Sequence, residues 1–523
     1  MISESNQTLC ELNGELVTDR SFQGEILLEG QVATFPKVHV TSESLRRSAV
    51  TCETAQSAFL EHNETFWQRL QSAWYGHGLF GVLTEMCSDE HHQNVPNALR
   101  SSCQFLLVSL RWVNGMQFTF FPHLKLSNDQ LLQSFSSNSN WLESPIRHLE
   151  WHSKANKFAI ALKDDTIRVH YCDNETVPVL KHKLQRNITD LKWKPLSASI
   201  LAVGTQTAIL IWNIDPMSMS TRPSTGAVQV LSYSGHSPVT SLSWSPHGFD
   251  QLFACSALSS AIVVWDVCQK KHQVIQHVTT SGGVSRLLFS LGGSKVLAAT
   301  PSSSFRVFET ASWSNERWSQ LSGRVQAACW NPNGTILLFS VVGDPRVYSL
   351  GFGDSHQSDK PVVDGSKNAV VVLDLTPDDE QDSDVKRDYI HSMVWDETGE
   401  RLAIMFHPDD PRSHVIALYS VSSLPVFTLT FRGNISGDGE SAPNFIAFKP
   451  NFNQGSCLTV CYSNGHVAYV PMYFKRSDRK TIAKQQLVAS PLDRLSFAHS
   501  RSMLNSSQSL WSSPHDVSSA VTS

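Results

Sequence analysis

A unit of three short strands recurs over residues 145–473 and constrains the fold of this chain more than any other feature. It is clearest in VTSLSWSPHGFDQLFACSALSSAIVVWDVC, residues 239–268, where an alternating strand, a small apolar strand and a β-branched strand follow one another. The connections between the strands are rich in Ser, Pro and Gly, which favour turns. A Gly-His pair precedes the unit, and Trp265 and Asp266 lie at its end.

Such a unit is typical of one blade of a WD-repeat propeller. Seven copies are present, and six of their first strands carry an aromatic residue at the sixth position, whereas the seventh carries it one residue earlier. These marker residues are Trp151, Trp193, Trp244, Phe289, Trp330, Trp395 and Phe448. They are separated by 42, 51, 45, 41, 65 and 53 residues, and the longer intervals indicate local insertions into a repeat of roughly 45 residues. We therefore predict an all-β fold, a seven-bladed WD40-type β-propeller.

The last copy lacks a fourth, outer strand, because the chain continues after Tyr473 into KRSDRKTIAKQQ and a serine-rich tail. A ring does not tolerate an unpaired strand edge at its closing blade. We therefore predict that ELVT, residues 15–18, or a nearby N-terminal strand closes the ring.

An N-terminal α-helical extension is predicted ahead of the ring. Six residues recur every three or four positions and form one face of a helix; they are Ala55, Phe59, His62, Phe66, Leu70 and Trp74. A further helix starts at Ser127, which together with Gln130 matches a capping box. The predicted domains are an N-terminal strand segment that closes the ring (1–40), the helical extension (41–140), the propeller (141–475) and a disordered Ser-rich tail (476–523).

Composition narrows the classes of function. The formal net charge is −5 and 17% of residues are charged, which gives no electrostatic footprint for nucleic acid or an anionic membrane. The ten cysteines form no C-x-x-C pair, and no apolar signal segment follows Met1. Reduced thiols in an intracellular protein are therefore expected.

No familiar catalytic or cofactor-binding motif is present. The strongest metal candidate is the set Cys87, His91, His92 and Cys103, but its spacing is unlike a usual zinc site. We expect no catalytic residue, no metal, no cofactor and no small-molecule substrate.

His236 and Trp265 are interpreted as members of a buried hydrogen-bond network that locks their blade. A propeller enzyme would need converging titratable groups at the channel, where the inner strands supply mainly apolar and hydroxyl residues, with Asp190 and Arg286 as isolated charges. The basic stretch at 180–186 is interpreted as a solvated turn, with contact to an acidic protein or a phosphate as the alternative.

Long strings in this chain resemble the aladin family, WD-repeat proteins of the nuclear pore complex. These strings are NGELVT, GLFGVL, FPHLKL, LKHKLQRNITDLKWKPLSASILAV, MSTRPS, GHSPVTSLSWSP, ERWSQLSGR and HSMVWDETGERLA. The resemblance covers roughly residues 11–475. It implies a non-enzymatic scaffold on the cytoplasmic side of the pore, held at the nuclear envelope by a transmembrane nucleoporin. It also implies roles in selective protein import and in spindle assembly.

The combined hypothesis is a docking platform whose partners are proteins. We expect neither direct binding to nucleic acid nor insertion into the membrane. Phe66, Leu70 and Trp74 are the candidate residues for anchoring at the envelope. The alternative is a WD-repeat substrate adaptor of a ubiquitin ligase or of a signalling complex.

Overall fold

The computed structural model describes most of the propeller and parts of the N-terminal region. The described residues are 7–12, 14–18, 35–45, 67, 70, 82–83, 86–87, 101–109, 123, 126–215, 220–224, 228–247, 250–276, 282–353, 363–376, 389–423, 426–437 and 441–473. Of the predicted helical region, residues 42–45 and 101–109 are helical, as are isolated described positions between them. Most of the helix expected at 55–74 and the Ser-rich tail lie outside the described residues.

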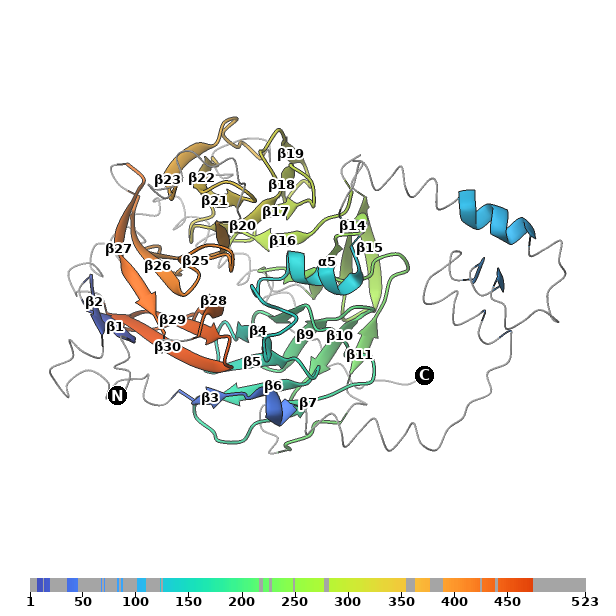
Figure 1. Cartoon of the computed structure of the whole chain (residues 1–523), viewed down its shortest axis with the longest axis horizontal. Helices are drawn as coiled ribbons and strands as arrows, with labels where there is room; N and C mark the ends of the chain where they lie inside the picture. The colour runs from blue at the N-terminus through green and yellow to red at the C-terminus, as the bar shows by residue number, and fades with distance from the viewer. Residues whose placement is uncertain are drawn as a thin grey trace, which may run out of the picture. The chain divides into compact units, whose positions relative to one another are not determined.

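Seven antiparallel sheets form the blades of a β-propeller, as the repeat predicted (Figure 1). The first three blades are β4 (Ile146–Trp151), β5 (Lys157–Leu162), β6 (Ile167–Tyr171) and β7 (Val179–Leu180); β8 (Asp190–Trp193), β9 (Ile200–Gly204), β10 (Ile209–Asn213) and β11 (Gln229–Leu231); and β12 (Ser241–Trp244), β13 (Gln251–Ser256), β14 (Ser259–Asp266) and β15 (Lys271–Gln276).

The next three blades repeat this order of strands. They are β16 (Arg286–Phe289), β17 (Lys295–Ala299), β18 (Phe305–Glu309) and β19 (Asn315–Trp318); β20 (Val325–Trp330), β21 (Ile336–Val341), β22 (Arg346–Gly351) and β23 (Val370–Asp374); and β24 (Ile390–Trp395), β25 (Arg401–Phe406), β26 (Val415–Ser422) and β27 (Thr428–Ser436). The first strand of each blade contacts the first strand of the next, and β28 (Pro443–Phe448) of the seventh blade returns to β4. The ring is therefore closed.

The seventh blade is completed by the N-terminus. Its own strands are β28, β29 (Gly455–Tyr462) and β30 (His466–Tyr473), and β30 pairs on its outer side with β1 (Thr8–Leu12). ELVT forms β2 (Glu15–Thr18), which pairs with β1 and not with β30. A short strand, β3 (Val38–His39), also pairs with the start of β30. The strand that closes the ring is thus the neighbour of ELVT, and ELVT adds a further strand outside it.

A buried ion pair fixes β1 to the sixth blade as well. Glu11 on β1 is fully buried, and Arg401 at the start of β25 donates to both of its carboxylate oxygens, with Nε 3.0 Å from each and Nη2 2.7 Å from Oε1. The backbone N–H of Ser436 on β27 also donates to Thr8 Oγ1 at 3.2 Å. The N-terminal strand therefore joins the sixth and seventh blades.

The hydrophobic core lies between neighbouring blades. One cluster, for example, combines Ala159 and Ile167 of the first blade with Leu191, Leu201 and Trp212 of the second. These side chains lie on alternating strand positions, so each sheet packs both of its faces against a neighbour. The stability of each blade therefore depends on packing against its neighbour.

The marker aromatics occupy one equivalent position in all seven blades. Each is the last residue of its inner strand and pairs with an apolar residue of the second strand, as in Trp151 with Phe158 and Phe448 with Leu458. The inner strand of the seventh blade starts at Pro443, one residue before the predicted start. The offset that the sequence suggested for Phe448 therefore disappears.

Three marker tryptophans also bond to the preceding blade. The indole N–H of each donates to the carbonyl of the residue just before the preceding marker: Trp193 to Glu150 at 3.1 Å, Trp244 to Lys192 at 3.0 Å and Trp330 to Leu288 at 3.1 Å. At the closure of the ring, Trp151 instead donates to Thr459 Oγ1 at 2.9 Å. Trp395 Nε1 has no partner among the described residues.

Replacing Trp244 by Phe should lower the free energy of unfolding by about 1–3 kcal/mol, because the change removes the donor and leaves the Lys192 carbonyl without its partner. Trp395→Phe is the matched control, since its indole N–H makes no hydrogen bond. Urea unfolding of both variants checks this prediction. Equal losses of stability would show that the indole bond contributes nothing.

Helix α5 (Asn128–Phe135) begins with the predicted capping box. Ser127 Oγ accepts from the Gln130 backbone N–H at 3.4 Å, and Gln130 Oε1 accepts from the Ser127 N–H at 3.2 Å. The helix and the residues after it bond to the ring, as described below. The propeller unit thus includes residues from 127 onwards, earlier than the predicted boundary at 141.

Candidate functional site

The central channel carries the charged inner-strand residues, and they are not isolated as the sequence suggested. His148 Nε2 of the first blade lies 3.2 Å from Asp190 Oδ1 of the second. Asp190 Oδ2 accepts the backbone N–H of Leu242, in the third blade, at 2.8 Å. Burial lowers the pKa of His148 to about 4, although Asp190 acts in the opposite direction. The histidine is therefore neutral near pH 7, and the pair holds three blades together.

Arg286 is the second of these charged groups. Its Nη1 donates to the Gln326 carbonyl at 3.2 Å and its Nη2 to Ser137 Oγ at 2.6 Å. Burial lowers the pKa of Arg286, and Asp190 opposes that effect. Burial lowers the pKa of His391 to about 3, and Arg286 adds a smaller effect in the same direction there and at His148. The guanidinium thus acts on groups from several blades, as expected of a charge near the middle of the channel.

A half-buried ion pair joins the inner strands of the first two blades. Lys192 Nζ lies 2.8 Å from Glu150 Oε2 and 3.9 Å from Asp190 Oδ1. Although burial acts to lower the pKa of Lys192, the two carboxylates raise it. Burial raises the pKa of Glu150, opposed by Lys192. These charged groups pair between the first two blades and so stabilise the ring.

Residues 127–144 cover one mouth of this channel and are called the plug segment from here on. Figure 1 shows α5 in front of the middle of the ring, and hydrogen bonds and two cation–π contacts join the segment to five blades. These contacts are Asn138 Nδ2 to the Ile146 carbonyl (2.6 Å), Trp141 Nε1 to the Ile188 carbonyl (3.1 Å), Arg286 Nη2 to Ser137 Oγ (2.6 Å), Ser139 N to the Asn444 carbonyl (3.0 Å), the Arg147 guanidinium to the Trp141 ring (4.2 Å) and the Arg324 guanidinium to the Phe135 ring (4.9 Å).

The hydrogen-bond network predicted for His236 and Trp265 is not formed among the described residues. Trp265 Nε1 has no hydrogen-bond partner, and its indole packs against the ring of His272 with centroids 5.0 Å apart. His236 is buried, and burial lowers its pKa to about 4, with the Ala254 backbone acting in the opposite direction. His236 and Trp265 therefore stabilise their blade chiefly through packing.

The metal candidate is not supported by the residues that can be placed. Cys103 is buried with Leu83 and Leu107, and Cys87 packs against this apolar cluster. His91 and His92 lie outside the described residues. In the part of the chain that the structure describes, no group of three His, Cys, Asp or Glu side chains could hold a metal ion.

The residues predicted for anchoring are only partly placed. Leu70 is buried, with 8% of its surface exposed. Phe66 and Trp74 lie outside the described residues. The helix over 101–109 nevertheless leaves Phe105 and Val108 exposed by 73% and 64%. Among the described residues, no helix combines the length and the apolar character needed to cross a membrane.

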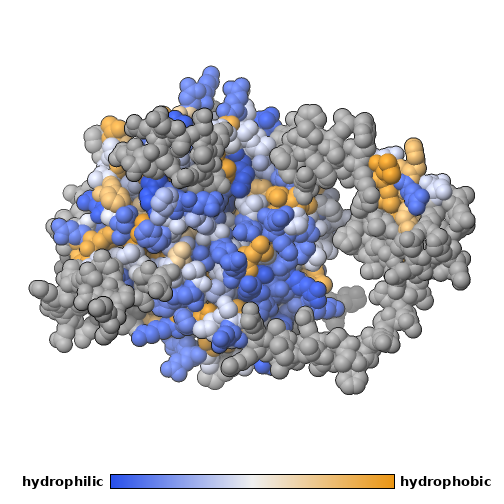
Figure 2. Space-filling model, viewed as in Figure 1, coloured by the Kyte–Doolittle hydropathy of each residue, from blue (hydrophilic) through white to orange (hydrophobic). Residues whose placement is uncertain are grey.

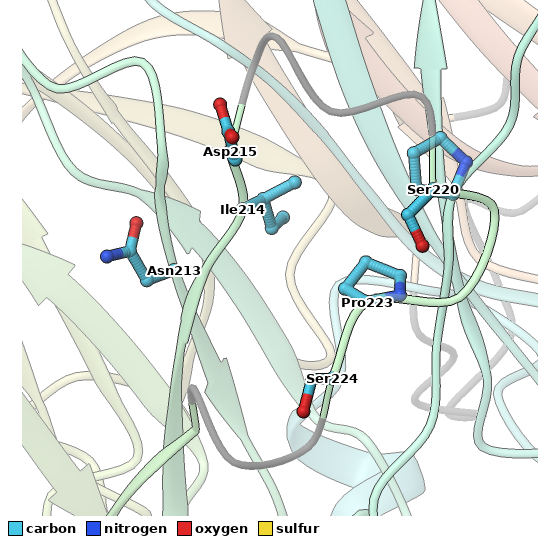
Figure 3. A pocket seen from close by; sticks show the side chains of 7 residues that line it. Asn213, Ile214, Asp215, Ser220, Pro223 and Ser224 are labelled. Carbon is cyan, nitrogen blue, oxygen red and sulfur yellow. The ribbon is translucent and has the colours of Figure 1, made fainter.

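A small cavity of about 180 Å³ lies beside the loop that follows β10. It is lined by Pro178, Asn213, Ile214, Asp215, Ser220, Pro223 and Ser224 (Figure 3). The side chains of Asn213 and Asp215 point away from Pro223 and Ser224 in this view. Polar groups that do not converge give little specificity for a small ligand.

The outer surface carries exposed apolar residues at separate places. The face seen in Figure 2 is mainly hydrophilic and carries small hydrophobic patches that are not continuous. Exposed apolar residues on the outer strands include Val230, Val274, Val370 and Phe431. Single exposed apolar residues of this kind are ordinary on a protein surface and do not by themselves mark an interface.

Comparisons with known proteins agree with this architecture. The family model described as the Aladin seven-bladed propeller matches residues 127–473, which include the plug segment. A relative from Arabidopsis thaliana named Aladin is 28% identical over 357 residues, which span 64% of this chain and 77% of the relative.

The chain also matches parts of two solved structures at low sequence identity. The β-propeller domain of Cps50 (Swd1) from Myceliophteria thermophila is 14% identical, with a TM-score of 0.48, and the match covers 62% of this chain and 96% of that domain. A chain of a mitotic checkpoint complex is 17% identical, with a TM-score of 0.46, and the match covers 61% of this chain and 85% of that one.

Proposed function

Because the chain belongs to the Aladin seven-bladed propeller family and is a propeller scaffold protein, we propose that it is a non-enzymatic docking subunit of the nuclear pore complex. In this proposal the protein lies at the nuclear envelope on the cytoplasmic side of the pore. It supports protein import between cytoplasm and nucleus and contributes to spindle assembly in mitosis. Its match to the family over the whole ring is the observation that carries the proposal.

The structure gives a physical reason for a docking role. The charged side chains of the channel bind other parts of the ring, as the contacts of Asp190, Lys192 and Arg286 illustrate. Such groups stiffen the ring and leave the loops, outer strands and N-terminal helices for recognition. A rigid ring that displays separate surfaces can hold several partners at fixed positions.

We propose that a transmembrane nucleoporin holds the protein at the envelope and that the N-terminal helical region contributes the contact. Phe66, Leu70 and Trp74 are the proposed contact residues. The exposed Phe105 and Val108 support an apolar contact in the same region of the chain, because exposed apolar side chains gathered on one helix favour a protein interface.

Replacing Phe66, Leu70 and Trp74 by Ser should disperse a fluorescently tagged protein from the nuclear rim. Leu70 is buried, so a second variant that changes only Phe66 and Trp74 separates anchoring from folding. Leu196→Ser is the matched control, since Leu196 is an apolar propeller residue that is 74% exposed. Retention at the rim of a well-folded Phe66 and Trp74 variant would refute this role.

A further inference from the structure

The plug segment contacts the ring in the way that a bound peptide contacts its receptor. It has two aromatic anchors, Phe135 and Trp141, with small polar residues between them. Trp141 is 1% exposed, and the Arg147 guanidinium lies 4.2 Å from the centre of its ring. Buried aromatic anchors of this kind dominate the energy of peptide and protein interfaces.

The receptor side of this contact is built around Arg286. In the part of the ring that the structure describes, no carboxylate forms a salt bridge with this half-buried guanidinium, although Asp190 acts on its pKa. A buried charge is costly unless hydrogen-bond acceptors surround it. The plug segment supplies one such acceptor, Ser137 Oγ, at 2.6 Å. Arg286 and the plug segment therefore stabilise each other.

Among the residues that the structure describes, further polar atoms at the mouth have no hydrogen-bond partner. Buried atoms of this kind are His391 Nε2, Gln326 Oε1 and Asn444 Nδ2. Gln326 and His391 lie next to each other, with Gln326 Nε2 3.5 Å from His391 Nδ1. The mouth thus offers more hydrogen-bonding capacity than the plug segment uses, as expected of a recognition site for polar peptides.

We propose that this mouth of the channel is a peptide-binding site, that residues 127–144 are its built-in occupant, and that Arg286 is the residue that holds the occupant. The ligand class is a short segment with aromatic anchors on either side of a hydrogen-bond acceptor that faces Arg286. While its own segment is bound, the ring closes this mouth to other peptides, so partners dock on the rim, on the opposite face or through the N-terminal helices.

The expected difference in peptide affinity depends on the effective concentration of the tethered segment. A segment joined directly to the ring competes at roughly millimolar effective concentration. A free peptide of the same sequence should therefore bind the intact protein at least about 100-fold more weakly than it binds a ring whose own plug is disabled.

The experiment uses the full chain and a fluorescent synthetic peptide of residues 127–144. In the released variant, Phe135→Ala, Ser137→Ala and Trp141→Ala weaken the tethered segment. The peptide should bind the released variant and show at least about 100-fold weaker binding to the unchanged protein. Adding Arg286→Met to the released variant should abolish binding, as should carrying the three alanine substitutions in the peptide. Arg306→Met is the matched control, since Arg306 bonds to Asn315 within its own blade.

Hydrogen exchange provides a second readout that needs no folded triple variant. In the unchanged protein, the amides of Leu131 and Asn138 should exchange as slowly as those of the propeller strands, and Ser137→Ala should accelerate both at least about tenfold. The proposal is overturned if the peptide binds both proteins equally, or if it binds neither while the released variant melts cooperatively. It is also overturned if these amides exchange at the rate of a free peptide in the unchanged protein.

Discussion

Deleting residues 1–30 is expected to lower the melting temperature of the protein by about 10 °C or more. The deletion removes β1, which covers the outer edge of β30, and it removes Glu11, the partner of the buried Arg401. An uncovered strand edge and an uncompensated charge are both destabilising. Differential scanning calorimetry of the shortened and full-length proteins measures the effect.

Removal of residues 476–523 is the control for this deletion, because the Ser-rich tail has the composition of a segment without a packed core. The shortened tail should leave the transition unchanged. If loss of residues 1–30 also left the melting temperature unchanged, β1 would not be needed to close the ring.

Arg401→Ala is expected to reduce the free energy of unfolding by about 3–5 kcal/mol, because it leaves the carboxylate of Glu11 buried without its partner. Replacing both members together, as Glu11→Leu with Arg401→Met, should cost much less, since no unpaired charge remains. Chemical unfolding of the single and double variants, compared in a mutant cycle, measures the coupling of the pair.

Arg346→Ala is the matched control for this pair. Arg346 makes a comparable contact to Asp344, with Nε 2.9 Å from Oδ1, but its side chain is 46% exposed. Asp344 itself is buried, but it keeps hydrogen bonds from the Tyr348 hydroxyl at 2.7 Å and from the Arg346 backbone N–H at 3.1 Å. Loss of the exposed Arg346 guanidinium should therefore cost less than loss of Arg401. Similar effects of Arg401→Ala and Arg346→Ala would mean that burial of the Glu11 pair contributes little.

The fold could be predicted because the repeat is local. Each marker aromatic ends one inner strand, and turns between strands of a blade contain residues suited to short hairpins, such as Gly334 between β20 and β21 and Gly465 between β29 and β30, with φ angles of 71° and 80°. A closing strand could also be predicted, since an unpaired edge is unfavourable. The sequence did not predict that Thr8–Leu12 is the closing strand, because its main contact, from Glu11 to Arg401, joins residues 390 positions apart in the sequence.

The contacts of the channel were predicted least well. Asp190 and Arg286 have no charged partner next to them in the sequence. In the folded ring, Asp190 bonds to Leu242 of another blade and Arg286 bonds to Ser137 of the plug segment. The capping box located the start of α5 correctly. The capping box does not predict that the plug segment packs on the ring. The start of a helix depends on neighbouring residues, whereas the contact of Trp141 with Ile188 joins residues far apart in the sequence.

The indole bonds between blades show a signal that sequence reasoning missed. Trp193, Trp244 and Trp330 share a strand position, so a common partner one position before the preceding marker could have been sought. By contrast, Gly235-His236 and Trp265-Asp266 suggested a hydrogen-bond network in which, among the described residues, neither the His236 ring nitrogens nor Trp265 Nε1 has a partner. Packing between blades replaces it, as Trp265 and Val263 show in the cluster with Ala202 and Leu242.

The scaffold proposal and the plug proposal are independent of each other. The first depends on the family to which residues 127–473 belong. The second depends on Arg286, Ser137 and the aromatic anchors. A ring with its mouth closed by its own chain would still serve as a scaffold through its rim and N-terminal helices.

Mild crosslinking of the tagged full-length protein in cells, followed by purification and mass spectrometry, tests the docking role most directly. We expect crosslinks to nucleoporins, including one with membrane-spanning segments, with some crosslinks in the N-terminal helical region. Recovery of ubiquitin-ligase or signalling-complex subunits in place of nucleoporins, or of no stable partner, would contradict the proposed function.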